Sequence, residues 1–193
     1  MSVFEGFTGR QKLTGRGSCL RAGARRLAAL ALLASAAAAW AQPKSDWERL
    51  EEERNWKETE VALPSFPRHE DRLPYLVSSA SDFRFFVDRP SISVGTDGVV
   101  RYTLIAVSPL GVENIGFEGV RCKGGEHKTY ATGRADGSWS RREGPWRRSA
   151  QRWQEELRVE YFCPWGRPIV TAAEGVDALK RGGHPGKGST RRD

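Results

Sequence analysis

Alternation of apolar and polar residues in the middle of the chain predicts a series of short β-strands. In residues 82–88, the apolar side chains Phe83, Phe85 and Val87 occupy every second position, which is the period of a strand. Further strand patterns occupy residues 91–94, 99–107, 115–122 and 127–133. Asp97-Gly98 and Asp136-Gly137 interrupt these patterns with residue pairs typical of hairpin turns. The strands are therefore expected to follow one another as antiparallel hairpins.

Helical spacing is found at both ends of this region. Ser45 and Glu48 have the spacing of a capping box, which predicts a short helix over about 46–54. One face of a longer helix is predicted from apolar residues spaced by three or four, namely Trp146, Ala150, Trp153, Leu157 and Tyr161. Pro164 ends that helix, and a second one is expected over about 171–181, ending at Gly182-Gly183.

The order of these elements predicts an α+β fold. It is an antiparallel β-meander of about five strands, with N- and C-terminal helices packed on one face. Three prolines within residues 61–77 predict an extended ribbon that lies over the core. The globular domain is expected to span residues 42–181, and the glycine-rich, basic residues 182–193 are expected to be a disordered tail.

The first 41 residues have the pattern of a secretory signal peptide. Arginines precede thirteen apolar or small residues, Leu27–Ala39, and Ala39-Trp40-Ala41 predicts cleavage after Ala41. A helix of that length rises only about 20 Å, which is less than the roughly 30 Å of a bilayer core. We therefore expect a periplasmic protein with no transmembrane span in the mature chain.

The charge distribution argues against a nucleic-acid-binding protein. The 193 residues carry a formal net charge of +7, but the leader holds six bases and one acid, which leaves a net of +2. Residues 180–193 hold five bases and one acid, so residues 42–179 carry a net of −2. The basic residues are thus concentrated in the leader and the tail rather than on the domain.

Cleavage of the leader would leave two cysteines, Cys122 and Cys163. In an oxidising compartment two cysteines predict one disulfide. The alternative is a reactive Cys122 thiol with His127 as its base.

Candidate catalytic and metal-binding residues are scattered. His69, His127 and His184 share no metal-ligand spacing, and no nucleophile, phosphate-binding or dinucleotide motif occurs. We therefore predict no catalytic residue, no metal site and no cofactor.

The most unusual segment is Trp139–Trp153, in which tryptophans and arginines alternate. Its candidate binding residues are Trp139, Arg141, Arg142, Trp146, Arg147, Arg148, Arg152 and Trp153. Aromatic faces beside guanidinium groups suit anionic glycans, lipid headgroups or an acidic protein. The alternative is that the tryptophans belong to the core and the arginines form a solvated surface.

Several strings together resemble the cryptic neisserial protein 1-like family of exported proteins from Gram-negative proteobacteria. The strings are Asp82–Asp88, Ser91–Leu104, Phe117–Cys122, Tyr130–Arg134, Tyr161–Pro164 and Ala178–Pro185. The resemblance covers residues 46–185. It implies a periplasmic or envelope domain in which Cys122 and Cys163 are paired, and it brings no catalytic residues.

A looser similarity is to surface-adhesin protein E-like domains. It rests on Phe85–Asp88, Ser91-Ile92, Cys122 and Tyr130–Gly133. This similarity favours binding over catalysis.

Taken together, the sequence favours a non-catalytic cell-envelope protein that binds an envelope protein, an anionic glycan or a lipid headgroup through Trp139–Trp153. One alternative is an assembly factor whose surface matters only inside a complex. The other is a periplasmic hydrolase that uses His127 and loop carboxylates.

Overall fold

The computed structural model describes residues 43–77, 81–149 and 151–185. The chain forms two compact units, one ending at Asn55 and the other beginning at Trp56. The predicted leader, residues 1–41, lies outside the described residues, so its cleavage stays a prediction. None of the helices in the described ranges is both long and apolar enough to cross a membrane.

Helix α2, Asp46–Arg54, is the described element of the first unit. Its capping box is formed as predicted. The Ser45 hydroxyl accepts from the Glu48 amide at 3.3 Å, and the Glu48 carboxylate accepts from the Ser45 amide at 2.7 Å. These two bonds satisfy backbone donors at the start of the helix, which would otherwise lack a partner.

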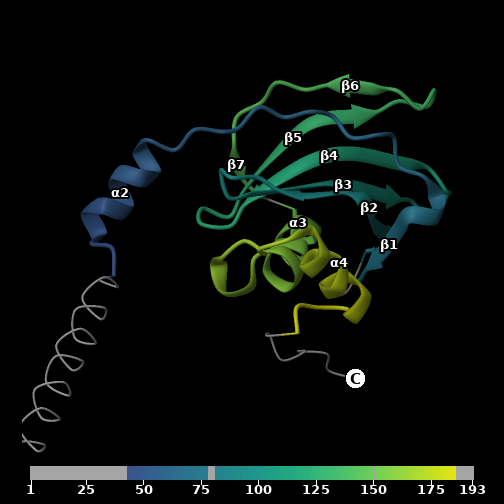
Figure 1. The fold of residues 1–193 in the computed structure, drawn as a ribbon. Helices are drawn as coiled ribbons and strands as arrows, with labels where there is room; N and C mark the ends of the chain where they lie inside the picture. Colours follow the sequence, from purple (N-terminus) through teal and green to yellow (C-terminus); the bar gives the residue numbers. More distant parts are fainter. Residues whose placement is uncertain (1–42, 78–80, 150, 186–193) are drawn as a thin grey trace, which may run out of the picture. The chain divides into compact units, whose positions relative to one another are not determined.

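The second unit contains an antiparallel sheet whose strands follow one another in chain order (Figure 1). The sequence of strands is β1 Arg72–Tyr75, β2 Arg84–Val94, β3 Val99–Val107, β4 Glu113–Arg121, β5 Glu126–Gly133 and β6 Trp139–Arg141. A seventh strand, β7 Arg147–Arg148, also pairs with β5. The predicted α+β meander is confirmed. The predicted segments 82–88 and 91–94 form one strand, β2, so four of the strands were expected, whereas the short strands β1, β6 and β7 were not.

The β2–β3 hairpin forms at the predicted Asp97-Gly98 turn. The Gly98 amide donates to the Gly95 carbonyl at 2.9 Å, and Gly98 adopts a positive φ of 75°. Asp97 keeps a negative φ, so only one of the two residues uses the left-handed region. The Asp97 carboxylate accepts from the Val99 amide at 3.1 Å, and this side-chain bond stabilises the turn.

The helical elements after the sheet are α3 Arg152–Glu156, the π-helical segment η3 Leu157–Phe162, the 3₁₀ turn η4 Pro164–Gly166 and α4 Ala172–Arg181. A further 3₁₀ turn, η2 His69–Asp71, precedes β1. The prediction of a helix that includes Trp146 is wrong, because this residue precedes β7 and α3 begins only at Arg152. By contrast, α4 has the predicted bounds, with Thr171 as its cap and a left-handed Gly182 after its end.

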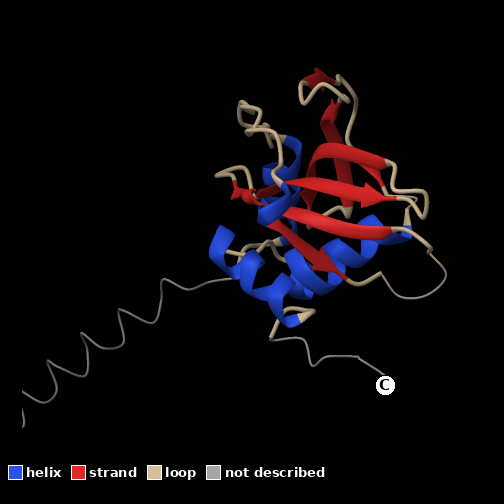
Figure 2. Ribbon diagram, turned by 90° about the vertical axis from the view of Figure 1, so that its right-hand side faces the viewer, coloured by secondary structure: helices blue, strands red, loops and turns tan. Residues whose placement is uncertain are grey.

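Two apolar layers cover the two faces of the sheet. The larger layer packs η3 and α4 residues, such as Leu157, Phe162 and Leu179, against one face (Figures 1 and 2). The smaller layer lies on the other face, where Phe117 and Tyr130 contact the extended ribbon that contains Val61 and Leu63. Every residue of β3 is buried, because both faces of the central strand are covered.

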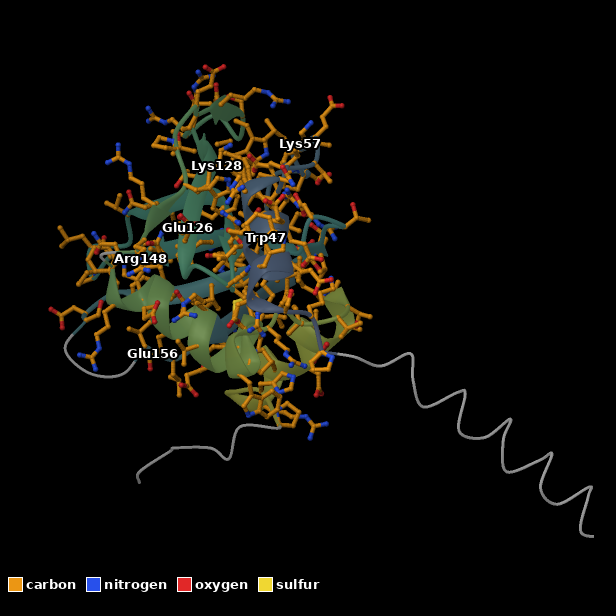
Figure 3. The ribbon with its side chains drawn as sticks, turned by 90° about the vertical axis from the view of Figure 1, so that its left-hand side faces the viewer. Trp47, Lys57, Glu126, Lys128, Arg148 and Glu156 are labelled. Carbon is orange, nitrogen blue, oxygen red and sulfur yellow. A yellow bond between two sulfur atoms is a disulfide. The ribbon has the colours of Figure 1, made fainter. Side chains whose placement is uncertain are left out.

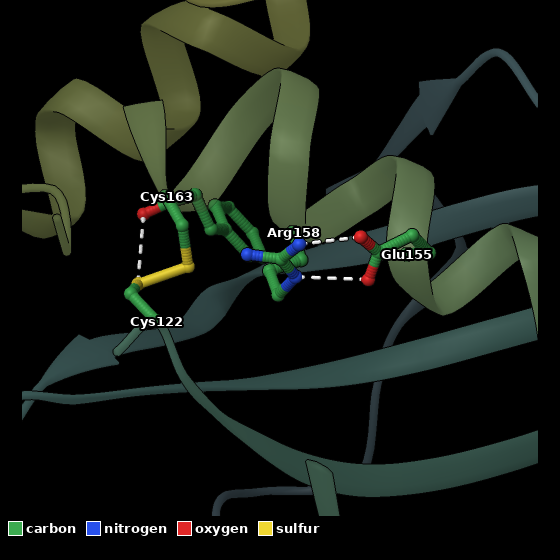
Figure 4. Close-up of a disulfide and its surroundings, with 5 residues drawn as sticks. Cys122, Glu155, Arg158 and Cys163 are labelled. Carbon is green, nitrogen blue, oxygen red and sulfur yellow. Dashed lines mark hydrogen bonds and ion pairs between the residues drawn. A yellow bond between two sulfur atoms is a disulfide. The ribbon is translucent and has the colours of Figure 1, made fainter. Parts of the chain in front are cut away.

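A disulfide joins Cys122, directly after β4, to Cys163, directly after η3 (Figure 4). The Cα atoms are 5.4 Å apart and the cysteines are 41 residues apart in sequence. The predicted pairing is confirmed, and the alternative of a reactive Cys122 thiol is wrong. The bond fastens the helical layer to the sheet, and Arg158 beside it pairs with Glu155 at 2.9 Å (Figure 4).

Residues 182–185, which were expected to begin the disordered tail, are part of the folded unit. His184 is 8% exposed, its amide donates to the Glu160 carbonyl at 2.8 Å, and its Nε2 lies 2.8 Å from Glu174 Oε1. The glycine-rich composition of this segment could not predict these contacts, because they join residues that are distant in sequence. The rest of the predicted tail, residues 186–193, lies outside the described residues.

Candidate anion-binding site at the sheet edge

The predicted arginine-rich segment forms the β5 edge of the sheet. Arg141 in β6 pairs with Ala131, and in β7 Arg147 and Arg148 pair with His127 and Glu126. The two strands are only three and two residues long, and Pro145 lies between them. Short edge strands with charges and proline discourage pairing with another chain, so these arginines have a structural role at the edge.

The three tryptophans of the segment do not share one surface. Trp139 donates from Nε1 to the Pro64 carbonyl at 2.9 Å and packs against Phe66, with 5.2 Å between ring centroids. Trp153 belongs to the opposite, helix-covered layer, where it stacks on Phe85 at 5.8 Å. The alternative that the tryptophans are packing residues therefore describes them better than a common binding face.

Trp146 lies in the smaller layer with Trp139. Its ring meets Trp56 and Tyr130 edge to face, at centroid distances of 5.9 and 6.3 Å. Its Nε1 donates to Glu58 Oε2 at 3.4 Å. This residue thus helps to hold the extended ribbon against β5.

The arginines remain at the surface. Arg141, Arg142, Arg147 and Arg148 are exposed on the β5 edge, whereas Arg152 is exposed at the start of α3. Arg142 is tied to β5, because its amide donates to the Tyr130 carbonyl at 2.7 Å and its Nε donates to Thr132 Oγ1 at 3.3 Å. Four of the five predicted arginines are therefore brought together and one is not.

Two of these arginines line a hollow of about 240 Å³ in the surface. Its lining residues are Val61, Lys128, Tyr130, Arg141, Arg142, Glu143 and Gly144. Figure 3 shows the same side of the molecule, where Lys128, Glu126 and Arg148 are labelled. The hollow therefore combines three cationic side chains with one carboxylate and an aromatic ring.

Glu58 fixes two of the lining residues, Lys128 and Tyr130, in place. Its carboxylate accepts from Lys128 Nζ and from the Tyr130 hydroxyl, both at 2.7 Å. Partial burial raises the pKa of Glu58, but the bonds from Lys128 and Tyr130 outweigh burial and leave the pKa below its ordinary value. The cost of burying Lys128 and Tyr130 is thus offset, whereas Arg141 and Arg142 remain at the rim.

A second carboxylate, Asp97, fixes the start of the ribbon. It accepts from the amide and the hydroxyl of Thr59, both at 2.9 Å, and from Arg101 Nη2 at 2.6 Å. Burial raises the pKa of Asp97, but these bonds outweigh it and hold the pKa well below its usual range. The sequence marked Asp97 only as a turn residue, and neither Glu58 nor Thr59 lies in a pattern that predicts these long-range contacts.

The remaining predicted chemical groups lie elsewhere. His127 is 6% exposed and faces the helical layer, since it is paired with the core residue Val120. Burial, together with the smaller effect of the positive charge of Arg158, lowers the pKa of His127 to about 4, and Glu155 opposes this shift. His69 is exposed in η2. Among the described residues, no group of three or more His, Cys, Asp or Glu side chains has the arrangement of a metal site.

Comparison with protein families gives one match, in which the model of the CNP1-like family covers residues 51–180. Searches of curated proteins and of solved structures found no match.

Proposed function

The chain belongs to the CNP1-like family, and we propose that it is a non-catalytic binding domain that holds an anionic group at Arg141 and Arg142. The observation that carries the proposal is the basic hollow on the β5 edge. Guanidinium groups offer paired donors in a fork that matches the oxygens of a carboxylate or a phosphate. The preferred ligand is thus a compact anion on an envelope protein, a glycan or a lipid headgroup.

The arrangement of Lys128 supports this assignment. Lys128 is bonded to Glu58, which fixes its ammonium in place and balances its charge, so the positive charge offered to a ligand comes from Arg141 and Arg142. Arg142 is oriented by Thr132, and Arg141 stands next to it on the neighbouring position. A ligand would therefore meet one guanidinium, that of Arg142, which is oriented before binding, and this lowers the entropic cost of association.

An exported, periplasmic location is part of the same proposal. Its supports are the leader pattern of residues 1–41 and the disulfide, because disulfides persist in oxidising compartments. Recovery of the intact protein from the periplasm with a mass that begins at Gln42 would establish it. A cytosolic protein that retains Met1 would contradict it.

A hydrolase built around His127 is less well supported. The imidazole is buried in the helix-covered layer, whereas the hollow lies at the edge on the ribbon-covered side. An assembly role remains compatible with the hollow, since a partner protein would offer its own carboxylates to the same arginines.

Calorimetric titration with inorganic pyrophosphate and with citrate tests the binding proposal. The variant R141Q/R142Q should lose binding, whereas R147Q/R148Q is a matched control that removes the same charge from the same edge outside the hollow. Both variants should keep their melting temperature, because the four side chains are exposed. Equal binding by the two variants, or no binding by the wild type, would show that the hollow is not an anion site.

A further inference from the structure

The hollow on the β5 edge contains one acidic side chain that a simple anion does not explain. Glu143 lines the hollow together with Arg141 and Arg142, and all three side chains are exposed. Within the described part of the chain, Glu143 forms no hydrogen bond and no ion pair. A carboxylate beside two guanidinium groups weakens the attraction of the hollow for a purely negative ligand. A site for simple anions would therefore be served better by a neutral residue at this position.

Other groups in the lining are unsuited to receive a positive charge. The Tyr130 hydroxyl donates to Glu58 at 2.7 Å, and Lys128 Nζ donates to the same carboxylate at 2.7 Å. The Tyr130 ring is only 7% exposed, and its centroid lies 5.3 Å from Lys128 Nζ and 5.6 Å from the Arg101 guanidinium. An incoming cation would thus be received by Glu143, whose carboxylate is exposed in the lining.

The charges of the lining match a ligand that carries both signs. Lys128 is balanced by Glu58, so Arg141, Arg142 and Glu143 leave the hollow with a net charge of +1. A phosphate monoester carries about −1.5 to −2 charges at pH 7, and an ammonium on the same molecule reduces this to about −0.5 to −1. Such a ligand complements the hollow both in net charge and in the presence of one opposite charge.

The backbone keeps the two signs of the hollow close together. Arg142 and Glu143 are consecutive residues, so their Cα atoms are about 3.8 Å apart. The Arg142 amide donates to the Tyr130 carbonyl at 2.7 Å, and its Nε donates to Thr132 Oγ1 at 3.3 Å. These bonds fix the guanidinium of Arg142 next to the start of Glu143. A ligand that contacts both residues must therefore carry its two charges within a few bonds of each other.

We propose that the hollow recognises a phosphate ester with an ammonium group a few bonds away, as in phosphoethanolamine. The inference rests on the anion-binding function proposed above and adds a second contact to it. The guanidinium groups of Arg141 and Arg142 donate to the phosphate oxygens, and Glu143 accepts from the ammonium. A phosphate without an ammonium meets the same arginines but also faces the uncompensated carboxylate of Glu143.

Calorimetric titration of the full-length protein with phosphoethanolamine and with ethyl phosphate isolates the ammonium, because both esters share the phosphate and the two-carbon chain. The wild type should prefer phosphoethanolamine by about fivefold, the effect of one favourable exposed ion pair. E143Q should bind ethyl phosphate more tightly and phosphoethanolamine more weakly, so that the preference disappears or reverses. The exposed position of Glu143 should leave the melting temperature of this variant unchanged.

Glu60→Gln is the matched control. Glu60 is exposed on the ribbon directly before Val61, which lines the hollow, but Glu60 itself lies outside the lining. E60Q therefore removes the same charge close to the site without removing the partner of the ammonium. It should keep the fivefold preference of the wild type, about the value expected for an intact ion pair.

The outcomes separate this inference from the function on which it rests. If Glu143 only pairs with Arg141 in solution, E143Q should strengthen the binding of both esters equally. An equal preference in wild type and E143Q, or a wild-type preference for ethyl phosphate, would overturn the inference and leave the anion site intact. No binding of either ester by the wild type, or unchanged binding by R141Q/R142Q, would overturn both.

Co-sedimentation with phosphatidylcholine vesicles, with and without phosphatidylethanolamine, distinguishes two sources of the ligand. Sedimentation that requires phosphatidylethanolamine and is weakened in E143Q would assign the recognised group to a lipid headgroup. Binding of phosphoethanolamine without vesicle binding would assign it to a soluble ester. Both results support the inference, because each shows an ammonium phosphate whose recognition depends on Glu143.

Discussion

Glu118 allows a quantitative test of how the core of this domain responds to pH. It lies on β4, faces the helical layer and is 6% exposed. Its Oε2 accepts from the Tyr102 hydroxyl at 3.3 Å and from Gln154 Nε2 at 3.2 Å. Burial raises the pKa of Glu118 from 4.5 to about 7, and the bonds from Gln154 and Tyr102 offset only part of that effect.

The sign of the effect follows from proton binding. Between pH 4.5 and about 7 the folded protein holds a proton on Glu118 that the unfolded chain releases. The contribution of Glu118 to the free energy of unfolding is therefore greatest below pH 4.5 and is lost as the pH rises through 7. Each pKa unit corresponds to about 1.4 kcal/mol, so the complete loss is roughly 3 kcal/mol.

His127 acts in the opposite direction over almost the same range. Its pKa is lowered from 6.5 to about 4, so its contribution is lost as the pH falls from 6.5 towards 4. The charged groups that shift the pKa of His127 are Arg158 and Glu155. Glu118 instead interacts with Tyr102 and Tyr75. The two contributions should nearly cancel between pH 5 and 6.5, which leaves a flat stability profile in the wild type.

Urea unfolding of the wild type, Glu118→Gln and His127→Leu between pH 5 and 8 measures this cancellation. The Glu118→Gln protein should gain about 2 kcal/mol between pH 5 and 6.5, because the contribution of His127 is no longer opposed. The His127→Leu protein should lose a similar amount, about 2 kcal/mol, over the same interval. A Glu118→Gln profile parallel to that of the wild type would refute the reasoning.

Further predictions concern the disulfide and the ion pair of Asp97 with Arg101. Replacing both Cys122 and Cys163 by alanine should lower the free energy of unfolding by about 4 kcal/mol in the chain-entropy account, and urea unfolding of wild type with reductant should reproduce that loss. Asp97→Asn should cost about 3 kcal/mol, because it leaves the buried Arg101 without its main partner, and it should speed tryptic cleavage at Lys57. Asp136→Asn, in an exposed turn, should change stability by less than about 0.5 kcal/mol, and an equal effect of both substitutions would contradict the role of Asp97.

The parts of the fold that could be predicted from sequence are those whose causes lie within a few residues. The Ser45–Glu48 capping box, the turn at Gly98 and the caps of α4 each depend on neighbouring side chains and a single backbone angle. Period-two alternation located β2 to β5 for the same reason. Local rules therefore gave the meander and its flanking helices.

Trp146 shows where such rules fail. Its spacing from Trp153 fits a helix, but this half-buried residue contacts Trp56 and Glu58, which lie about ninety residues earlier in the chain. Periodicity alone does not distinguish the face of a helix from a loop residue that another segment covers. The contacts of His184 with Glu160 and Glu174 were missed for the same reason, because composition describes a segment without its partners.

The candidate site depends both on local sequence pattern and on contacts between segments that are distant in sequence. The arginines at 141–148 were visible in the sequence, but Lys128, Tyr130 and Val61 complete the hollow from other segments. Arg147 and Arg148 belong to the same charged run, yet β7 places them along the edge of the sheet rather than in the lining. Changing all four arginines at once would therefore combine loss of a ligand contact with loss of edge protection. Only the comparison of R141Q/R142Q with R147Q/R148Q separates the two roles, because each pair removes the same charge and only one pair lines the hollow.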